Sequence, residues 1–177
     1  MADEDIKIAG APRPSAPEPQ QDYLIQSSNG NIARAKLLGA AIAERTVSSA
    51  ALPRGEGENE ADFDLQLQRG ILLAFSAVVS IESAVLPAPL EDVIKQAFYT
   101  ELGRNDPMLY KETAESGAFS FYYLAYRRGI ETERRIGQTF AMLCSHDGDP
   151  VYQEIGEALY CWMCSKTAGA VKEAAFV

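Results

Sequence analysis

The sequence has little of what metal-dependent and thiol-dependent enzymes need. Among 177 residues it contains one histidine and three cysteines. A single histidine excludes di-iron sites of the ferritin type, which need two Glu-x-x-His motifs. Three cysteines are too few for a disulfide framework, and their odd number leaves at least one thiol unpaired. These counts favour a cytoplasmic protein with reduced thiols.

Basic residues and long apolar runs are also scarce. The chain carries 16 Lys and Arg against 25 Asp and Glu, a net charge of −9, which argues against binding to nucleic acid. The most apolar stretch, residues 71–81, is about half as long as the roughly 20 residues that cross a bilayer. The N-terminal sequence Met-Ala-Asp-Glu-Asp lacks the basic and apolar regions of a secretory signal. We therefore expect no nucleic-acid partner and no membrane association.

The first 20 residues differ in composition from the rest of the chain. They hold four of the nine prolines and almost no large apolar side chains, so burial cannot offset their ordering entropy. We expect a flexible N-terminal tail over residues 1–20, followed by one domain over residues 21–177. The spacing Pro14-Ser-Ala-Pro17 matches PxxP, which proline-reading domains bind but which is also a very common spacing.

From residue 31 onward the apolar residues recur with the period of a helix. The pattern predicts helices over residues 31–50, 62–86, 89–102, 106–128, 131–145 and 150–166. Asn31 is the expected N-cap of the first helix, Gly103 the expected residue after the third, and Gly117 a potential break in the fourth. No segment alternates clearly with period two. The sequence therefore predicts an all-α domain of five to six helices, packed as a bundle or orthogonally.

Two of the predicted helices carry apolar residues on more than one side. In helix 62–86 the residues expected to face the core are Leu67, Ile71, Phe75, Val78, Val79 and Val85. In helix 150–166 one face carries Val151, Ile155, Leu159 and Trp162. Cys161 and Cys164 fall on the other face, which either packs against another helix or subunit or leaves the thiols accessible. We expect packing, and therefore thiols that are protected in the folded protein.

All three cysteines and the only histidine fall within a short part of the sequence, at Cys144, His146, Cys161 and Cys164. Three thiolates and one imidazole would make a zinc site of the Cys₃His kind. Cys161 lies about 16 Å along the helix from Pro150, whereas Cys144 and His146 precede that helix. Four ligands around one ion would require the helix to break. We expect no metal ion, and we keep this set as an alternative.

Four arginines surround the predicted turn at Gly129. They are Arg127, Arg128, Arg134 and Arg135, and their charge makes them a candidate site for phosphate or an acidic ligand. Glu131, Glu133 and the end of the preceding helix offer these arginines partners within the protein. The cluster is therefore either an anion-binding site or a set of local ion pairs.

An aromatic stripe precedes the arginines. Phe119, Tyr122, Tyr123 and Tyr126 recur at the spacing of one helix face, and packing in the core is the simplest interpretation. Tyrosine hydroxyls need polar partners when they are buried. Tyr122, Tyr123 and Tyr126 are therefore also candidates for the edge of a pocket or a partner surface.

No catalytic set emerges from these residues. His146 has two aspartates nearby but no nucleophile in a recognisable sequence context, and the chain contains neither Gly-x-x-x-x-Gly-Lys nor Gly-x-Gly-x-x-Gly. We expect no cofactor. The sequence predicts a non-enzymatic helical protein that binds a protein partner or self-associates through helix faces. Two alternatives stay open: a small enzyme or sensor that uses the Cys161 and Cys164 thiols or the arginine site, and an acidic inhibitor that mimics nucleic acid.

Overall fold

The computed structural model describes residues 19–51, 60–114 and 117–177. These residues form eight helices and no strand, so the all-α prediction is confirmed, although the helices outnumber the five to six expected. They are α1 (Pro19–Ser28), α2 (Asn31–Ala50), α3 (Glu60–Glu82), α4 (Ala88–Asn105), α5 (Pro107–Ala114), α6 (Phe119–Tyr126), α7 (Thr132–Leu143) and α8 (Pro150–Glu173). The predicted N-terminal tail and its PxxP spacing lie outside the described residues, except for the last two tail residues, which open α1.

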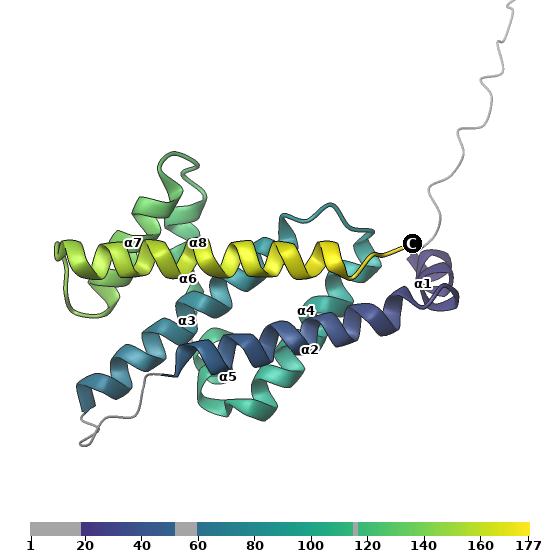
Figure 1. Ribbon diagram of the computed structural model, residues 1–177, viewed down its shortest axis with the longest axis horizontal. Helices are drawn as coiled ribbons and strands as arrows, with labels where there is room; N and C mark the ends of the chain where they lie inside the picture. Colours follow the sequence, from purple (N-terminus) through teal and green to yellow (C-terminus); the bar gives the residue numbers. More distant parts are fainter. Residues whose placement is uncertain (1–18, 52–59, 115–116) are drawn as a thin grey trace, which may run out of the picture.

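Helix α3 runs between two other long helices (Figure 1). On one side α2 packs against α3 and, more extensively, against α4. On the other side α8 packs against α3 and α7. Helix α1 and the α6–α7 pair lie at opposite ends of the molecule (Figure 1). The short helices therefore complete a framework that α2, α3 and α8 set up.

Helix α3 is central because its second half is almost entirely apolar. Residues 70–79 are all buried, and so is Ile81, which agrees with the prediction that this helix is apolar on more than one side. The predicted burial of Val85 is wrong, since α3 ends at Glu82 and the Val85 side chain is fully exposed. Pro87 keeps the helix from reaching residue 86, because a proline disfavours the helical conformation of the residue before it.

Local capping determines where several helices begin. The Asp106 carboxylate accepts a hydrogen bond from the Leu109 amide at 2.9 Å, and the Asp149 carboxylate accepts one from the Val151 amide at 2.8 Å. Both Asp-Pro sequences therefore start helices, at the positions where the predicted helices 106–128 and 150–166 begin. Gly117 has a φ of +75°, and it separates α5 from α6. The predicted break in the fourth helix is therefore confirmed.

Two predicted helix ends are wrong. Helix α4 does not stop at Gly103 but continues to Asn105. A Cβ atom at Gly103 would lie 3.4 Å from the Tyr110 ring, so this glycine serves the contact between α4 and α5 and does not end the helix. Helix α8 continues past residue 166 to Glu173. Its additional turns lie beside the link between α3 and α4 and form part of a groove described below.

Glycines allow the closest helix crossings. A side chain at Gly39 of α2 would collide with the Ile94 main-chain oxygen of α4. A side chain at Gly137 of α7 would collide with the Gln153 main-chain oxygen of α8, and Gly156 of α8 faces back toward α7. The α2–α4 and α7–α8 pairs therefore pack backbone against backbone, with no room for a methyl group at these positions.

Candidate functional site

The buried face of α8 is not the one that the sequence predicts. Its buried residues are Gly156, Tyr160, Met163 and Thr167. Val151, Ile155 and Trp162 of the predicted apolar face are 60%, 38% and 39% exposed. The cause is the crossing with α7, where a Cβ atom at Gly156 would lie 2.6 Å from that of Phe140. This close contact sets the rotation of α8, so most of the predicted apolar face points outward and only Leu159 of that face stays half-buried against the core.

The three thiols differ in exposure. Cys161 is exposed, so its predicted protection is wrong, whereas Cys144 and Cys164 are half-buried. Burial raises the pKa of Cys144 to about 11. Burial, followed by the nearby carboxylates of Glu133 and Glu157, raises the pKa of Cys161, and burial also raises that of Cys164. A reactive cysteine needs a lowered pKa, so these surroundings do not activate any of the three thiols.

The four residues of the alternative zinc set do not come together. Among the described residues, no group of three or more His, Cys, Asp or Glu side chains could hold a metal ion. The His146 ring stacks on the Tyr152 ring with their centroids 3.8 Å apart. The Cys164 thiol donates a hydrogen bond to the Ser76 carbonyl at 3.7 Å. Each of these two residues is thus engaged by a different neighbour.

The four arginines of the predicted anion site divide into two pairs. The Arg127 guanidinium lies 5.8 Å from the centroid of the Tyr123 ring, a cation–π contact. Arg134 forms an ion pair with Glu131 across 3.6 Å. Arg128 and Arg135, in contrast, line the same hollow between α6 and α7. The structure therefore groups two of the four predicted residues at one place on the surface.

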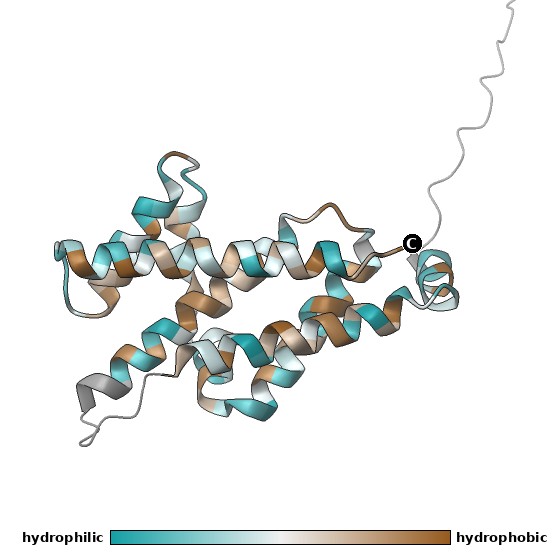
Figure 2. Ribbon diagram, in the orientation of Figure 1, coloured by the Kyte–Doolittle hydropathy of each residue, from teal (hydrophilic) through white to brown (hydrophobic). Residues whose placement is uncertain are grey.

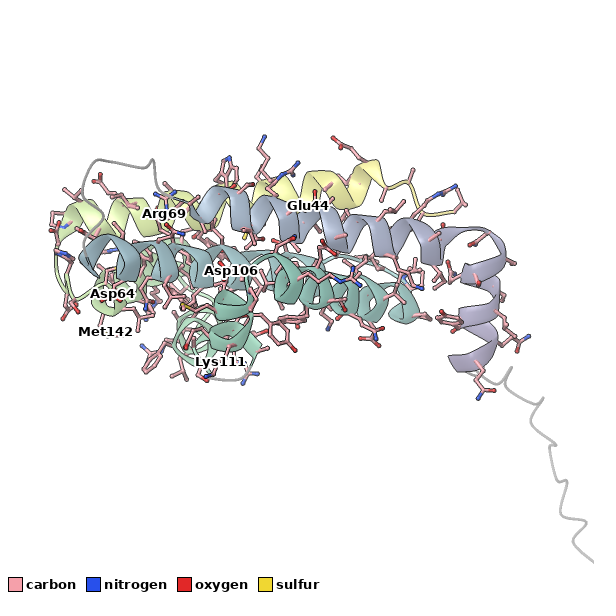
Figure 3. All side chains as sticks on the ribbon, turned by 90° about the horizontal axis from the view of Figure 1, so that it is seen from below. Glu44, Asp64, Arg69, Asp106, Lys111 and Met142 are labelled. Atoms are coloured by element: carbon pink, nitrogen blue, oxygen red, sulfur yellow. The ribbon has the colours of Figure 1, made fainter. Side chains whose placement is uncertain are left out.

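We call this place the arginine hollow. It has a volume of about 280 Å³ and is lined by Phe121, Leu124, Ala125, Arg128, Arg135, Gln138, Thr139, Met142 and Asp147. Three of its large apolar side chains are well exposed, with Phe121 at 51%, Leu124 at 65% and Met142 at 43%. Met142 lies at the end of the molecule away from α1 (Figure 3). The hollow thus combines exposed apolar surface with two cations.

The two cations are held differently. The Arg135 Nε–H donates to the Ile130 carbonyl at 2.9 Å, which anchors this side chain at the start of α7. Arg128 has no hydrogen bond or ion pair within the described ranges. Asp147 supplies one carboxylate among the residues that line the hollow. The hollow therefore carries a surplus of positive charge on a protein whose net charge is −9.

The three candidate tyrosines surround Phe75 of α3. Tyr122 stacks on its ring at 5.3 Å, and Tyr123 and Tyr126 meet it edge to face at 5.1 and 6.2 Å. Tyr122 is fully buried, its hydroxyl has no partner among the described groups, and burial raises its pKa. The Tyr123 hydroxyl donates to the Glu82 carboxylate at 3.3 Å. Core packing accounts for this stripe, and Tyr126 also lines a pocket.

That pocket is a groove of about 990 Å³, which we call the α3–α8 groove. It lies between the end of α3, the link to α4 and the second half of α8, and Figure 2 shows the middle of this link as apolar. Its lining residues are Gln26, Asn31, Val79, Ser80, Ser83, Ala84, Val85, Leu86, Pro87, Tyr126, Tyr160, Cys164, Ser165, Ala168, Val171, Lys172, Ala175, Phe176 and Val177. The volume falls at the upper end of the range for small-molecule sites, roughly 300–1,000 Å³.

The polar groups of the groove bond largely to one another. The Ser83 hydroxyl donates to the Val79 carbonyl at 2.6 Å, so it accepts from the Tyr126 hydroxyl at 3.1 Å. The Cys164 thiol is hydrogen-bonded with the hydroxyls of Ser80 and Tyr160. Burial is the main cause of the raised pKa of Tyr160. The Tyr160 hydroxyl and the Cys164 thiol are therefore uncharged at neutral pH.

One end of the groove is closed by the residues that follow α8. Asn31 is not the N-cap of α2, because Gly30 with a φ of +81° occupies that position. The buried Asn31 side chain instead donates to the Val177 carbonyl at 2.5 Å and accepts from the Val177 amide at 3.2 Å. Arg34 donates to the Ala175 carbonyl at 2.9 Å. These bonds hold residues 174–177 against the junction of α1 and α2.

Comparison with protein-family models, with curated proteins and with solved structures finds no match for this chain. In the described part, one segment, Asp64–Glu82, is long and apolar enough to cross a membrane by length and composition, and 61% of it is buried within the molecule. The core helix of a soluble protein passes the same test, so this is weak evidence for a membrane span. The function is therefore inferred from the arginine hollow and the α3–α8 groove.

Most residues of both sites are not among those that the sequence singles out. Phe121 and Leu124 lie on the outer face of α6, and the short sequence Phe-Ser-Phe-Tyr-Tyr-Leu-Ala-Tyr is apolar all round. That pattern was a usable signal, because a helix near the surface with two apolar faces exposes one of them. The α3–α8 groove has no comparable signal. It joins residues 79–87 with residues 160–177, and nothing local relates the two segments.

Proposed function

We propose that this chain is a non-enzymatic partner-binding protein, and that the arginine hollow binds an acidic amphipathic helix of a partner protein. One observation carries the proposal: the hollow gathers exposed Phe121, Leu124 and Met142 around Arg128 and Arg135. Interface cores are enriched in aromatic residues, methionine and arginine relative to the rest of the surface. The hollow has this composition.

The choice of an acidic partner follows from charge. Arg128 lies beside Leu124 with no ion pair within the described ranges, and Arg135 is fixed by its bond to Ile130. Desolvating either guanidinium under an apolar partner would be costly unless a carboxylate came with it. A helix with apolar residues on one face and glutamates along its edge satisfies both requirements. Such a helix would cover the apolar side chains and pair with the cations.

A pair of synthetic helical peptides tests this proposal. One carries Leu and Phe on one face with Glu along the edges, and the other replaces each Glu by Lys. We expect the acidic peptide to bind, measured by fluorescence anisotropy, and the basic peptide not to bind. Added salt should weaken the interaction, because rim ion pairs are screened. Equal binding of both peptides, or no binding of either, would contradict the proposal.

Two substitutions locate the binding surface. Leu124→Asp should weaken binding of the acidic peptide at least about tenfold, the effect expected of a central interface residue. Arg128→Glu should weaken its binding to the same extent. Leu37→Asp is the matched control, because Leu37 is a 73% exposed leucine on α2. A concentration-dependent dimer that Arg128→Glu dissociates would instead identify a second copy of this chain as the occupant.

The two alternative functions have less support. The raised pKa values of the three thiols do not favour a thiol nucleophile. An inhibitor that mimics nucleic acid needs a continuous acidic face. The acidic group of Glu82, Glu91 and Asp92 is instead interrupted by Lys95, which lies 3.6, 2.7 and 4.0 Å from these carboxylates.

A further inference from the structure

We propose that the α3–α8 groove binds a fatty acid, with its chain along the apolar walls and its carboxylate at Lys172. This site is separate from the arginine hollow, and the inference does not depend on the proposed partner. It rests on three features of the groove: its walls, its internal hydrogen bonds and its single cation.

The walls of the groove are largely apolar. Val79 and Leu86 contribute from α3 and the link that follows it, and Val171 and Phe176 contribute from the other side. From Tyr160 to Lys172 the groove follows α8 for about 18 Å at 1.5 Å per residue. An elongated apolar ligand fits a site of this form, whereas a compact polar ligand leaves most of it unfilled.

The hydrogen bonds among the groove's own polar groups allow an apolar chain to bind there at little cost. Because Ser83 bonds with Val79 and Tyr126, and Cys164 bonds with its own neighbours, these groups already have partners when water leaves. Burying a polar group is costly only when it loses its hydrogen bonds. A sugar or a nucleotide would instead need donors and acceptors that are free to bind it.

The single cation of the groove limits the charge of the headgroup that it can bind. Lys172 is the one ionised side chain among the lining residues that the structure describes, and it is exposed in the last turns of α8. A single ammonium suits one carboxylate and is too little for a phosphate with two charges, which arginine pairs usually bind. A monocarboxylate with a long chain is therefore the ligand class that matches both the walls and the charge.

Parinaric acid, a polyene fatty acid whose fluorescence rises in apolar surroundings, tests the site with the full chain. After extraction of bound lipid, we expect saturable binding of one molecule per chain with a Kd of about 0.1 mM or tighter, from the usual efficiency of ligands of this size. Ala168→Trp should fill the groove and abolish this binding. Ala158→Trp, an exposed alanine on the same helix outside the groove, should leave it unchanged.

The headgroup contact is tested separately with oleate and oleyl alcohol, which share a chain and displace the probe. Lys172→Met should weaken the binding of oleate about threefold to fivefold, as expected for a surface ion pair. The binding of oleyl alcohol should be unchanged. Lys166→Met, an exposed lysine of α8 outside the groove, should alter neither. Because Lys172→Met removes no core contact, this result holds even if Ala168→Trp fails to fold. Absence of saturable binding, or equal effects of both lysine variants, would overturn the proposal.

Discussion

Helices α2 and α8 lie on opposite sides of α3, yet they relate differently to their sequences. In α2 the apolar residues Ile32, Ala35, Leu38 and Ile42 recur with the period of a helix, and all four are buried. In α8 the expected stripe is mostly exposed, and a less apolar face that includes Gly156 and Thr167 is buried. In α2 the glycine of the close crossing, Gly39, lies among these buried apolar residues, so the crossing and the stripe favour the same rotation. In α8 the crossing glycine, Gly156, lies off the apolar stripe, and the contact with α7 prevails over it.

The largest expected difference comes from the same substitution in the two helices. Ile42→Ala in α2 should lower the free energy of unfolding by about 2–5 kcal/mol, because Ile42 is 2% exposed and leaves a cavity. Ile155→Ala in α8 should lower it by less than about 1 kcal/mol, because that side chain is 38% exposed. Urea denaturation measures both values. Equal decreases in the free energy of unfolding would show that α8 buries its apolar face.

Glycine substitutions test the crossings themselves. Gly39→Ala and Gly137→Ala should each destabilise the protein by about 1–3 kcal/mol, since the added methyl group meets main-chain atoms that cannot easily move. Gly169→Ala is the matched control in α8, because nothing lies within 4 Å of its added methyl group. That substitution should be neutral or stabilising by up to about 1 kcal/mol. Thermal unfolding compares the three, and a neutral Gly137→Ala would contradict the glycine explanation for α8.

The reaction rates of the two thiols of α8 test which face of this helix is buried. In the native state, Cys161 should react with a thiol reagent at least about tenfold faster than Cys164, because Cys161 is exposed and Cys164 is half-buried and bonded to Ser76. Variants with a single cysteine assign the two rates. In denaturant the rates should converge. Faster labelling of Cys164 would mean that the rotation of α8 described here is wrong.

The smallest expected effect is the pH dependence at Cys144, near the end of α7. Its pKa of about 11 in the folded protein exceeds the ordinary thiol value of 9.0, so the unfolded chain loses this proton first. The contribution of the neutral thiol is complete below pH 9 and declines as the pH rises through 11. Chemical denaturation of the wild type and Cys144→Ala should therefore show a stability difference that changes over this interval. A constant difference would mean that burial does not perturb this thiol.

Part of the candidate site could be predicted from sequence. The arginine cluster was identifiable from the positions of its residues in the sequence, but its division into two pairs was not. Arg128 and Arg135 share the arginine hollow because the α6–α7 turn brings them together, while Tyr123 and Glu131 engage the other two arginines. The α3–α8 groove could not be predicted, since the bond of its lining residue Cys164 with Ser76 joins residues 88 positions apart.

The sequence by itself determined the features that depend on neighbouring residues. Helical periodicity, the caps at Asp106 and Asp149 and the break at Gly117 all act over a few residues, so they hold in any surroundings. Only the tertiary structure decided which face of α8 is buried, why α4 continues past Gly103 and what Asn31 bonds with. These outcomes depend on how closely two helices can approach. That distance is set by the partner surface and not by the pattern along either helix.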